Sequence, residues 1–261
     1  MNGLDTGYRK MRRYWISNNQ IDAESITFDG DQFHHIFIVC RQIVGHQFEA
    51  LTDDGLAYLV QVTAVLKRSA TTKILSHRKI PELPKPYIHL ALSIPRFPVF
   101  DAICEKAVEM GVHKIVPFTS DFSFIREAKE FSESKFERLG KIVLSASQQS
   151  GRGDFMKIEP ISRMDQIIGR IGKNYFSFFA YEGETQSTLQ REINRLKTQQ
   201  GQVPENIWIF VGSEGGFSTT EVKQLTDLGL HPVTLGGQIL RVETACMTLV
   251  SILKYEFGLM E

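Results

Sequence analysis

The sequence contains few cysteines, no long hydrophobic run and no excess of charge of either sign. Its three cysteines, Cys40, Cys104 and Cys246, lie far apart, and their odd number argues against a disulfide framework. The longest apolar runs are much shorter than a membrane span, and no basic segment precedes an apolar signal core. Thirty Lys and Arg balance thirty Asp and Glu, which argues against a chain that grips polyanions along its whole surface. We therefore expect a cytoplasmic globular protein without a membrane segment.

Several widespread catalytic motifs are also missing. The sequence has neither a Gly-Lys-Ser/Thr phosphate loop nor a GxGxxG unit, and it has no GxSxG nucleophile turn. The seven histidines show neither HExxH spacing nor pairing with cysteines, so we predict no metal site. His34 and His35 are adjacent, and in the strand that we expect there their side chains would point to opposite faces.

The first part of the chain has the pattern of a β-rich domain. Short apolar runs are separated by turn residues, and the Asp-Asp-Gly sequence at 53–55 is typical of a hairpin. We expect strands at Ile36–Val39, Gln47–Leu51 and Tyr58–Val65. The spacing predicts a small β-barrel over residues 1–77, of which 1–10 are a loose extension. Residues 78–86 contain three prolines and predict an extended linker.

After Tyr87 the hydrophobic period changes, and strands alternate with helices. The expected strands are 88–94, 114–118, 175–181, 207–211 and 231–235. The expected helices are 100–111, 136–147, 185–198, 219–228 and 244–257. This alternation predicts an α/β domain over residues 87–261, with a mainly parallel sheet covered on both faces.

A glycine-rich turn follows the strand that ends near Val211. Gly212, Gly215 and Gly216 permit positive φ angles and let a ligand approach the backbone. The sequence Ser-Thr-Thr-Glu at 218–221 then has the arrangement of a capping box, and the N–H groups of a helix start can bind an anion or a carboxylate. The alternative is a tight turn and a capped helix without a ligand.

A second strand-to-loop junction lies about twenty residues further on. Arg241 and Glu243 stand there in a loop that enters an almost entirely apolar helix. Arg241 offers a planar fork of donors for a phosphate, carboxylate or polarised carbonyl, whereas the simpler alternative is an Arg241–Glu243 ion pair on the surface. Two such junctions close in sequence predict one binding crevice at the carboxyl ends of parallel strands.

Two further segments carry candidate RNA contacts. Gly151 is a plausible end to the preceding helix, so Arg152 either reaches a phosphate or simply follows a helix terminus. Residues 8–15 interleave four cations with three aromatic rings, a composition that suits loop or single-stranded RNA. The alternative for this segment is a frayed basic arm with one packed aromatic residue.

Ordered motifs along nearly the whole chain from Met11 resemble the ribosomal RNA small subunit methyltransferase E family. Val211–Ser218 and Leu235–Ala245 resemble its two closing motifs. Four segments resemble earlier motifs of the family: Glu105–Val112, Gln149–Arg152, Arg12–Trp15 and His34–Ile36. Two departures stand out, because the family usually has proline at position 213, here Ser213, and Pro-Arg at 237–238, here Gly237 and Gln238.

The resemblance implies a fold, a cofactor, a reaction and partners. It implies a SPOUT-type α/β domain with a deep trefoil knot, although true knots are rare exceptions among folds. It also implies a preceding PUA-like β-barrel that binds RNA, and a homodimer with sites at the subunit interface. The methyl donor would be S-adenosyl-L-methionine, and the reaction would be methylation of N3 of a specific uridine of 16S rRNA in the small ribosomal subunit.

The matching motifs assign roles to residues. For catalysis we nominate Arg241 as the cation for an ionised uracil ring, with Arg152 holding an RNA phosphate or the same anion. Either Glu243 or Glu214 would accept the proton, and the sequence does not choose between them. The expected cofactor-binding residues are Ala180, Tyr181, Glu182, Gly212, Ser213, Glu214, Gly215, Gly216, Leu235, Gly236, Ile239, Leu240, Arg241, Thr244 and Ala245. The expected RNA-binding residues are Arg9, Lys10, Arg12, Arg13 and Arg152.

Other functions fit parts of the same pattern. A methyltransferase of this fold could act on another nucleotide, in 23S rRNA or in tRNA. A non-catalytic RNA-binding assembly factor is favoured only by the departures at Ser213 and Gln238. A nicotinamide oxidoreductase has the least support, because no GxGxxG unit is present.

Overall fold

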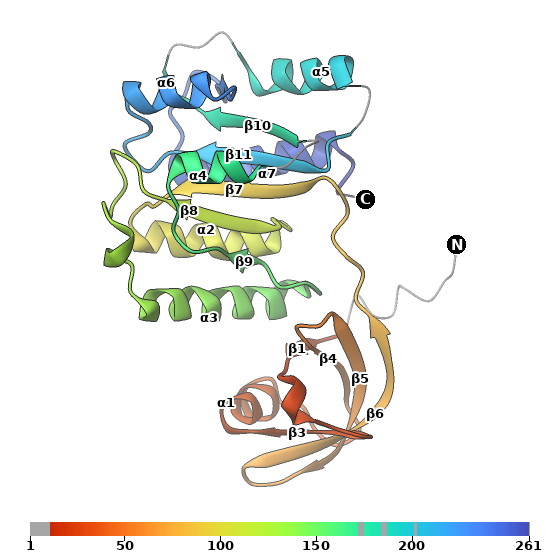
Figure 1. Ribbon diagram of the computed structural model, residues 1–261. Coiled ribbons are helices and arrows are strands. Elements are labelled where there is room, and N and C mark those ends of the chain that lie inside the picture. Colours follow the sequence, from red (N-terminus) through yellow and green to blue (C-terminus); the bar gives the residue numbers. More distant parts are fainter. Residues whose placement is uncertain (1–10, 172–174, 184–186, 201–202, 261) are drawn as a thin grey trace. The chain divides into compact units, whose positions relative to one another are not determined.

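The computed structural model describes residues 11–171, 175–183, 187–200 and 203–260, which form two compact units (Figure 1). One unit contains the described residues up to Glu82 together with Ser147–Phe155. The other contains Leu83–Ala146 and the described residues from Met156 onward.

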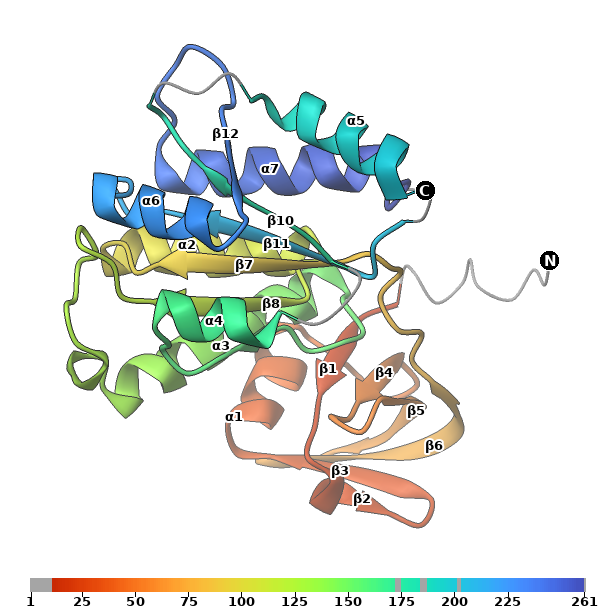
Figure 2. The same ribbon diagram turned by 45° about the horizontal axis from the view of Figure 1, so that its top comes forward.

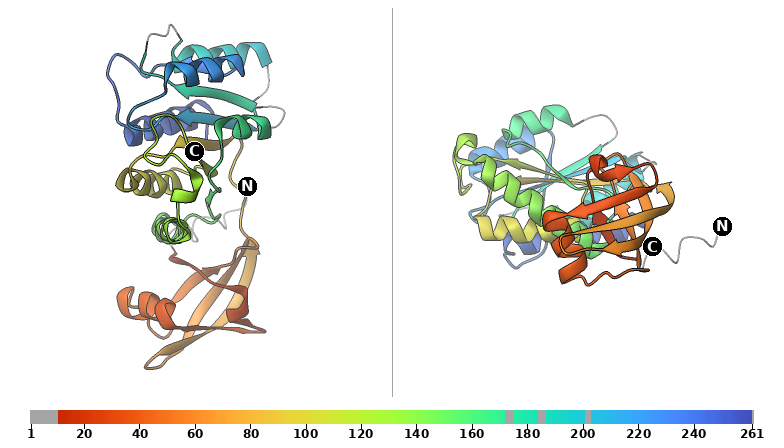
Figure 3. Two further views of the ribbon diagram at one scale, coloured as in Figure 1. Left: turned by 60° about the vertical axis from the view of Figure 1, so that its left-hand side comes forward. Right: turned by 90° about the horizontal axis from the view of Figure 1, so that it is seen from below.

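The first unit is built on a six-stranded sheet in the order β1-β4-β5-β6-β3-β2. Its strands are β1 (Arg13–Trp15), β2 (Ile21–Asp22), β3 (Ser25–Asp29), β4 (Gln47–Leu51), β5 (Leu56–Val65) and β6 (Ser69–Lys79). Only β1 and β4 pair in parallel, and the long β5–β6 hairpin is orange in Figure 3. The predicted turn at 53–55 is confirmed, because β4 and β5 pair antiparallel across it. No ladder between described residues joins β1 to β2, so the barrel stays a prediction.

The predicted strand at Ile36–Val39 is wrong. A short helix, α1 (Gly30–Phe33), continues directly into a π-helical segment, His34–Val39. Phe33, Ile36 and Phe37 are buried against the sheet, and their spacing of three and four residues fits a helix rather than a strand. Burial of these side chains therefore overrides the strand preference of the β-branched residues around them.

A buried ion-pair cluster joins Ser147–Phe155 to the first unit. The Glu49 carboxylate is only 1% exposed, and it accepts hydrogen bonds from Arg13 Nε at 2.8 Å and from Arg78 Nε at 2.9 Å. Arg13 also donates to the carbonyl oxygen of Gly151. Loss of either arginine would leave a buried carboxylate short of a partner, which typically costs several kcal/mol.

The second unit is an α/β domain on a six-stranded sheet in the order β12-β10-β11-β7-β8-β9, in which every pairing is parallel. The strands are β7 (Tyr87–Ser93), β8 (Lys114–Phe118), β9 (Lys157–Ile158), β10 (Tyr175–Ala180), β11 (Asn206–Val211) and β12 (His231–Val233). The helices are α2 (Phe97–Glu109), α3 (Glu133–Ser150), α4 (Met164–Arg170), α5 (Leu189–Gln200), α6 (Thr219–Asp227) and α7 (Val242–Glu256). The described chain also has short 3-10 turns at Asn18–Gln20 and Ala128–Glu130.

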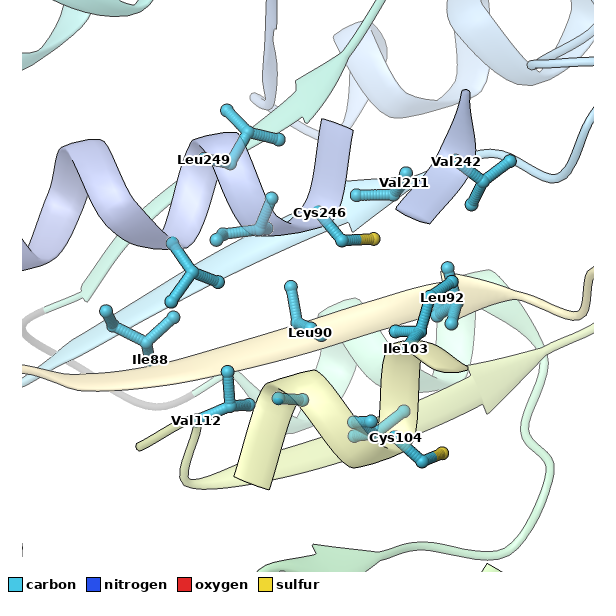
Figure 4. Packing of buried hydrophobic residues seen from close by; sticks show 14 of the residues in the cluster. Ile88, Leu90, Leu92, Ile103, Cys104, Val112, Val211, Val242, Cys246 and Leu249 are labelled. Atoms are coloured by element: carbon cyan, nitrogen blue, oxygen red, sulfur yellow. The ribbon is translucent and has the colours of Figure 1, made fainter. Parts of the chain in front are cut away.

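Helices cover both faces of this sheet (Figures 1 and 2). One core layer packs α2, α3, α5 and α7 against alternate strand residues, and Figure 4 shows it around Ile88, Leu90 and Leu92 of β7. The opposite layer packs α4 and α6 against the intervening residues, such as Ala91 and Phe210. The strands therefore alternate between two buried faces, which is why they appear as nearly continuous apolar runs.

Most of the predicted strands and helices of this unit are confirmed within a few residues. The capping box that opens α6 is present, because Ser218 Oγ accepts the N–H of Glu221 and Glu221 accepts the N–H of Ser218. α4 and β9 were not predicted, because each is too short to show a hydrophobic period. None of the helices formed by the described residues is long and apolar enough to cross a bilayer.

His89 of β7 gives this unit a stability that depends on pH. Its ring is 3% exposed, lies 4.5 Å from the Trp208 ring, and has Nε2 at 2.8 Å from Asn206 Oδ1. Burial lowers the pKa of His89 from the ordinary 6.5 to about 4. As pH falls, the unfolded chain therefore binds this proton before the folded chain does. The folded state loses stability between the two pKa values, from pH 6.5 down to about 4.

We predict that the free energy of unfolding of this unit falls by about 3 kcal/mol between pH 6.5 and pH 4 through His89 alone. Urea unfolding followed by Trp208 fluorescence in a Trp15→Phe background measures it. His89→Gln should flatten this dependence, whereas His77→Gln, at an exposed position of the other unit, should leave it unchanged. Equal pH slopes for the wild type and His89→Gln would contradict the prediction.

Candidate functional site

An open pocket lies at the carboxyl ends of three neighbouring strands of the second unit. It contains about 600 Å³ of empty space, including its solvent-open mouth. Its walls come from the loop after β10, the loop after β11 and the segment between β12 and α7. These are the two predicted strand-to-loop junctions and a third loop beside them. The crevice that the sequence predicts is thus present in the α/β unit.

Most of the predicted cofactor residues line this pocket. They are Ala180, Tyr181, Glu182, Gly212, Ser213, Gly216, Leu235, Gly236, Ile239, Leu240 and Ala245. The pocket also includes six residues that the sequence did not nominate: Val211, Val233, Thr234, Gly237, Gln238 and Val242. Val211 and Val233 are the last residues of β11 and β12, so the strand pattern could have indicated them, and Val242 is the first residue of α7.

A second hollow adjoins the first and shares part of its wall. The shared residues are Glu182, Ser213, Gly216, Ile239, Leu240 and Val242. Its other lining residues are Arg96, Val99, Glu214, Arg241 and Glu243. The structure therefore places Glu214 and Arg241 in this second pocket rather than in the first, while Gly215 and Thr244 line neither. Arg96 was missed, although it lies only two residues after the end of the predicted strand at 88–94.

Two glycines shape the loop after β11, and one of them, Gly216, lets it meet the loop after β10. Gly216 has a φ of +69°, and a Cβ built on it would collide with the Glu182 carboxylate. A Cβ on Gly212 would lie 2.7 Å from the carbonyl oxygen of Gly216. In contrast, Gly237 has no other heavy atom within 4 Å of its Cβ position. The pocket wall therefore requires glycine at 212 and 216, and also at Gly236, whose φ is +119°, but not at Gly237.

Glu214 fixes the loop after β11 to the start of α2. Its carboxylate accepts the backbone N–H of Arg96, the residue before the helix, at 3.0 Å. A carboxylate in this position satisfies a free donor and is favoured by the positive end of the helix dipole. The contact holds Arg96 beside the second pocket. It also leaves the Glu214 carboxylate engaged in a structural hydrogen bond.

Arg241 and Glu243 begin α7 and face the second pocket. Arg241 is exposed and precedes the first helical residue, and its carbonyl oxygen accepts the N–H of Ala245 at 2.8 Å. Its side chain has neither a hydrogen bond nor an ion pair with any residue that the structure describes. The surface pair Arg241–Glu243, the simpler alternative, is therefore not formed among the described residues.

Arg12, Arg13 and Arg152 lie in the first unit. The Arg152 side chain is 5% exposed and binds Asp154 through two hydrogen bonds of 2.9 and 2.6 Å. Arg13 is held by Glu49, whereas Arg12 is exposed and donates to the carbonyl oxygen of Cys40 at 3.0 Å. Arg9 and Lys10 lie outside the described residues. The structure thus does not place Arg152 in the unit that contains the pockets.

No group of three or more metal-binding side chains occurs among the residues that the structure describes. The first pocket instead offers backbone N–H and C=O groups beside apolar walls, a combination typical of sites for organic ligands. The second adds two guanidinium groups and two carboxylates, those of Glu214 and Glu243, which suits a polar acceptor whose charge changes during a reaction.

Comparison with known proteins gives a consistent family. The model of an RNA methyltransferase domain matches residues 81–254. The ribosomal RNA small subunit methyltransferase E of Bacillus subtilis is 28% identical over 96% of this chain and 98% of its own length. The Aquifex aeolicus protein of the same name is 32% identical over 82% of this chain and 87% of its own.

A solved structure has the same fold. It is a ribosomal RNA small subunit methyltransferase E from Neisseria gonorrhoeae bound to S-adenosyl methionine, with a TM-score of 0.77 and 24% identity, covering 94% of this chain and 97% of that one. The matching family model and relatives support the same assignment as the ordered sequence motifs. The chain therefore belongs to the ribosomal RNA small subunit methyltransferase E family.

Proposed function

We propose that the protein transfers a methyl group from S-adenosyl-L-methionine to N3 of a specific uridine of 16S rRNA in the small ribosomal subunit. The observation that carries the proposal is the pair of adjoining pockets, because they share one wall formed by the loops after β10 and β11. A donor in one pocket and an acceptor base in the other would meet at that wall. The names of the relatives support ribosomal RNA as the substrate.

The residues of the first pocket fit a bent adenosyl donor. Backbone groups of the loops at 180–183, 212–216 and 234–240 would bind the edge of the adenine ring. Leu235, Ile239 and Leu240 would supply apolar walls, and the glycine backbone leaves space for close approach. When bound, the donor supplies an electrophilic methyl group.

Arg241 is the group that we assign to stabilise the acceptor. Uridine N3 carries a proton and becomes a good nucleophile only when that proton leaves, with the charge spread over the flanking carbonyl oxygens. The Arg241 guanidinium lines the acceptor pocket and has no partner among the described residues, so it can meet this charge. A cation held where charge develops lowers the barrier of the step.

Glu243 rather than Glu214 is our proton acceptor. Glu214 already accepts the N–H of Arg96 and caps α2, so its protonation would weaken a structural contact. Glu243 lines the same pocket and has no side-chain hydrogen bond with a described residue. It is therefore the carboxylate that can change its protonation state without loosening the fold.

The remaining parts of the proposal concern topology and assembly. The chain passes from the edge strand β12 through residues 234–241 to α7, which packs on α2 and the inner strand β11, and this path supports a deep trefoil knot of the SPOUT type.

Exposed Ile239 (82%) and Tyr255 (76%) supply apolar surface for a second subunit of a homodimer. We propose the first unit as a PUA-like barrel in which Arg12 contacts RNA phosphate, because Arg13 and Arg152 are held in ion pairs.

The direct test is to isolate small-subunit rRNA from cells that lack this protein and map its modified nucleotides by mass spectrometry. Loss of one methyl group on a single uridine, restored by the purified protein and S-adenosyl-L-methionine, is the expected result. A missing methyl group in 23S rRNA or tRNA would assign a different target. If RNA modification were unchanged in these cells, and calorimetry showed no binding of S-adenosyl-L-methionine, a non-catalytic assembly factor would be favoured.

Gly216→Ala should weaken donor binding by roughly tenfold or more, because alanine is strained at this positive φ and its Cβ would displace Glu182. Isothermal titration with S-adenosyl-L-methionine measures the effect. Gly237→Ala is the matched control, since its Cβ position is open and it should bind the donor nearly as well as the wild type. Equal affinities for the two variants would remove the first pocket as the donor site.

Arg241→Ala should lower kcat by about 100- to 1,000-fold while the donor still binds, because the charge on the uracil ring loses its counter-charge. Single-turnover methyl transfer to small ribosomal subunits measures the rate. Arg163→Ala, which removes an exposed arginine from an ion pair elsewhere on this unit, is the control. Undiminished turnover by Arg241→Ala would take this residue out of the mechanism.

Glu243→Gln should lower kcat by about 100-fold at neutral pH, and the deficit should shrink at higher pH as solvent removes the N3 proton. The pH profile of methyl transfer measures this. Glu214→Gln should instead lower the free energy of unfolding by only about 0.3–1 kcal/mol, because glutamine keeps the oxygen that accepts the Arg96 N–H but loses the charge beside the helix start. A deficit of Glu243→Gln that does not change with pH would contradict its role as proton acceptor.

A further inference from the structure

The loop that follows β8 presents two phenyl rings to solvent. Phe122 is 47% exposed and Phe124 is 51% exposed, whereas Ser123 and Ile125 between and after them are buried. Large apolar rings that remain exposed in close succession mark an interaction surface more often than chance. We call Phe122 and Phe124 the phenyl platform.

Hydrogen bonds fix the backbone of the phenyl platform. Ser213 Oγ donates to the carbonyl oxygen of Phe122 at 2.6 Å, and the Phe124 N–H donates to the carbonyl oxygen of Ile94 at 2.8 Å. The buried Ser123 hydroxyl lies 2.8 Å from the Ser120 carbonyl oxygen and 2.6 Å from that of Ile125. The loop that carries the two rings is therefore fixed by hydrogen bonds, and the exposure of the rings is a stable feature of the fold.

Contacts connect the phenyl platform to the second pocket at two points. A Cβ built on Gly215 would lie 2.8 Å from Phe122 Cβ, so the loop after β11 packs closely against this residue. The Phe124 ring meets the Phe97 ring edge-on at 5.4 Å, and Phe97 follows Arg96, which lines the pocket. A polymer that enters the second pocket would thus pass over these rings.

The charges around the platform favour a polyanion. Arg96 and Arg126 are exposed, and Lys135 Nζ lies 4.2 Å from the centre of the Phe97 ring. Two nearby carboxylates are engaged by the protein, since Asp121 accepts the Ser218 hydroxyl and Glu130 accepts the N–H groups of Arg126 and Glu127. The Arg96 and Arg126 side chains have no hydrogen bond or ion pair with a described residue, so they can meet phosphate groups, whereas Lys135 Nζ donates to the Glu130 carbonyl oxygen at 2.9 Å.

We infer that the phenyl platform stacks unpaired bases of the RNA next to the nucleotide that enters the second pocket. The inference rests on the proposed function, because it takes that pocket as the acceptor site. Exposed aromatic rings beside cations suit unpaired bases, since every base has a face that can stack and a phosphate that a cation can meet. Continuity with the pocket argues for this partner over a protein or a second copy of this chain.

The experiment compares Phe124→Tyr with Phe124→Leu, and Phe122→Tyr with Phe122→Leu. Tyrosine keeps the stacking face, and leucine keeps apolar area without it. With small ribosomal subunits as substrate, the leucine variants should raise KM by roughly 5- to 100-fold, because a stacked base contributes about 1–3 kcal/mol. The tyrosine variants should stay within about twofold of the wild type in KM. kcat at saturation and donor affinity should not change.

Leu228→Ala is the control, because it removes an apolar side chain that is 48% exposed on the same unit. Co-sedimentation with small ribosomal subunits reads binding without any chemistry, so it separates this inference from the proposed function. If the wild type binds but transfers no methyl group, the proposed function fails while the contrast between tyrosine and leucine still tests the platform. Equal binding of small ribosomal subunits by the tyrosine variants and the leucine variants overturns the inference. A change of oligomeric state in the leucine variants also overturns it, in favour of contact with a second copy.

Discussion

The site depends on one loop, residues 212–218, which joins three neighbours at once. Glu214 accepts the N–H of Arg96 at the start of α2, and Ser213 donates to the Phe122 carbonyl oxygen in the loop after β8. The backbone of Gly216 leaves space for Glu182 after β10. Each contact lies at the carboxyl end of a different parallel strand, so this loop sets where the pocket walls stand relative to one another.

This arrangement explains why the two pockets carry different chemistry. The first lies among glycine backbone and aliphatic side chains of strand ends, so it offers hydrogen bonds in an apolar setting. The second lies where two helices begin, and their first residues bring Arg96, Arg241 and Glu243 to its rim. Charged side chains at helix starts can face a ligand without being buried, which keeps the cost of desolvation low.

The pattern of the α/β unit was readable from sequence because its strands are buried on both faces and its helices have long apolar stripes. Local spacing could not show contacts between distant segments. Arg13 lies in a basic segment of the sequence, yet Glu49, 36 residues further along the chain, holds it in an ion pair. Arg152 is held by Asp154, which is only two residues away, so this pairing was within reach of the local sequence. His34–Val39 looked like a strand, yet its apolar side chains pack as a helix. For Arg13 and for His34–Val39 the deciding partner or surface belongs to the folded chain.

Ser213 shows how a departure from a family pattern can carry information. Proline, the residue that the family usually has at this position, has no hydroxyl and could not donate to the Phe122 carbonyl oxygen. With serine, the wall of the first pocket and the loop that bears Phe122 and Phe124 are joined by a hydrogen bond of 2.6 Å. A shift of one loop would therefore also move the other loop. Serine at this position therefore adds a hydrogen bond between the loop after β11 and the loop after β8.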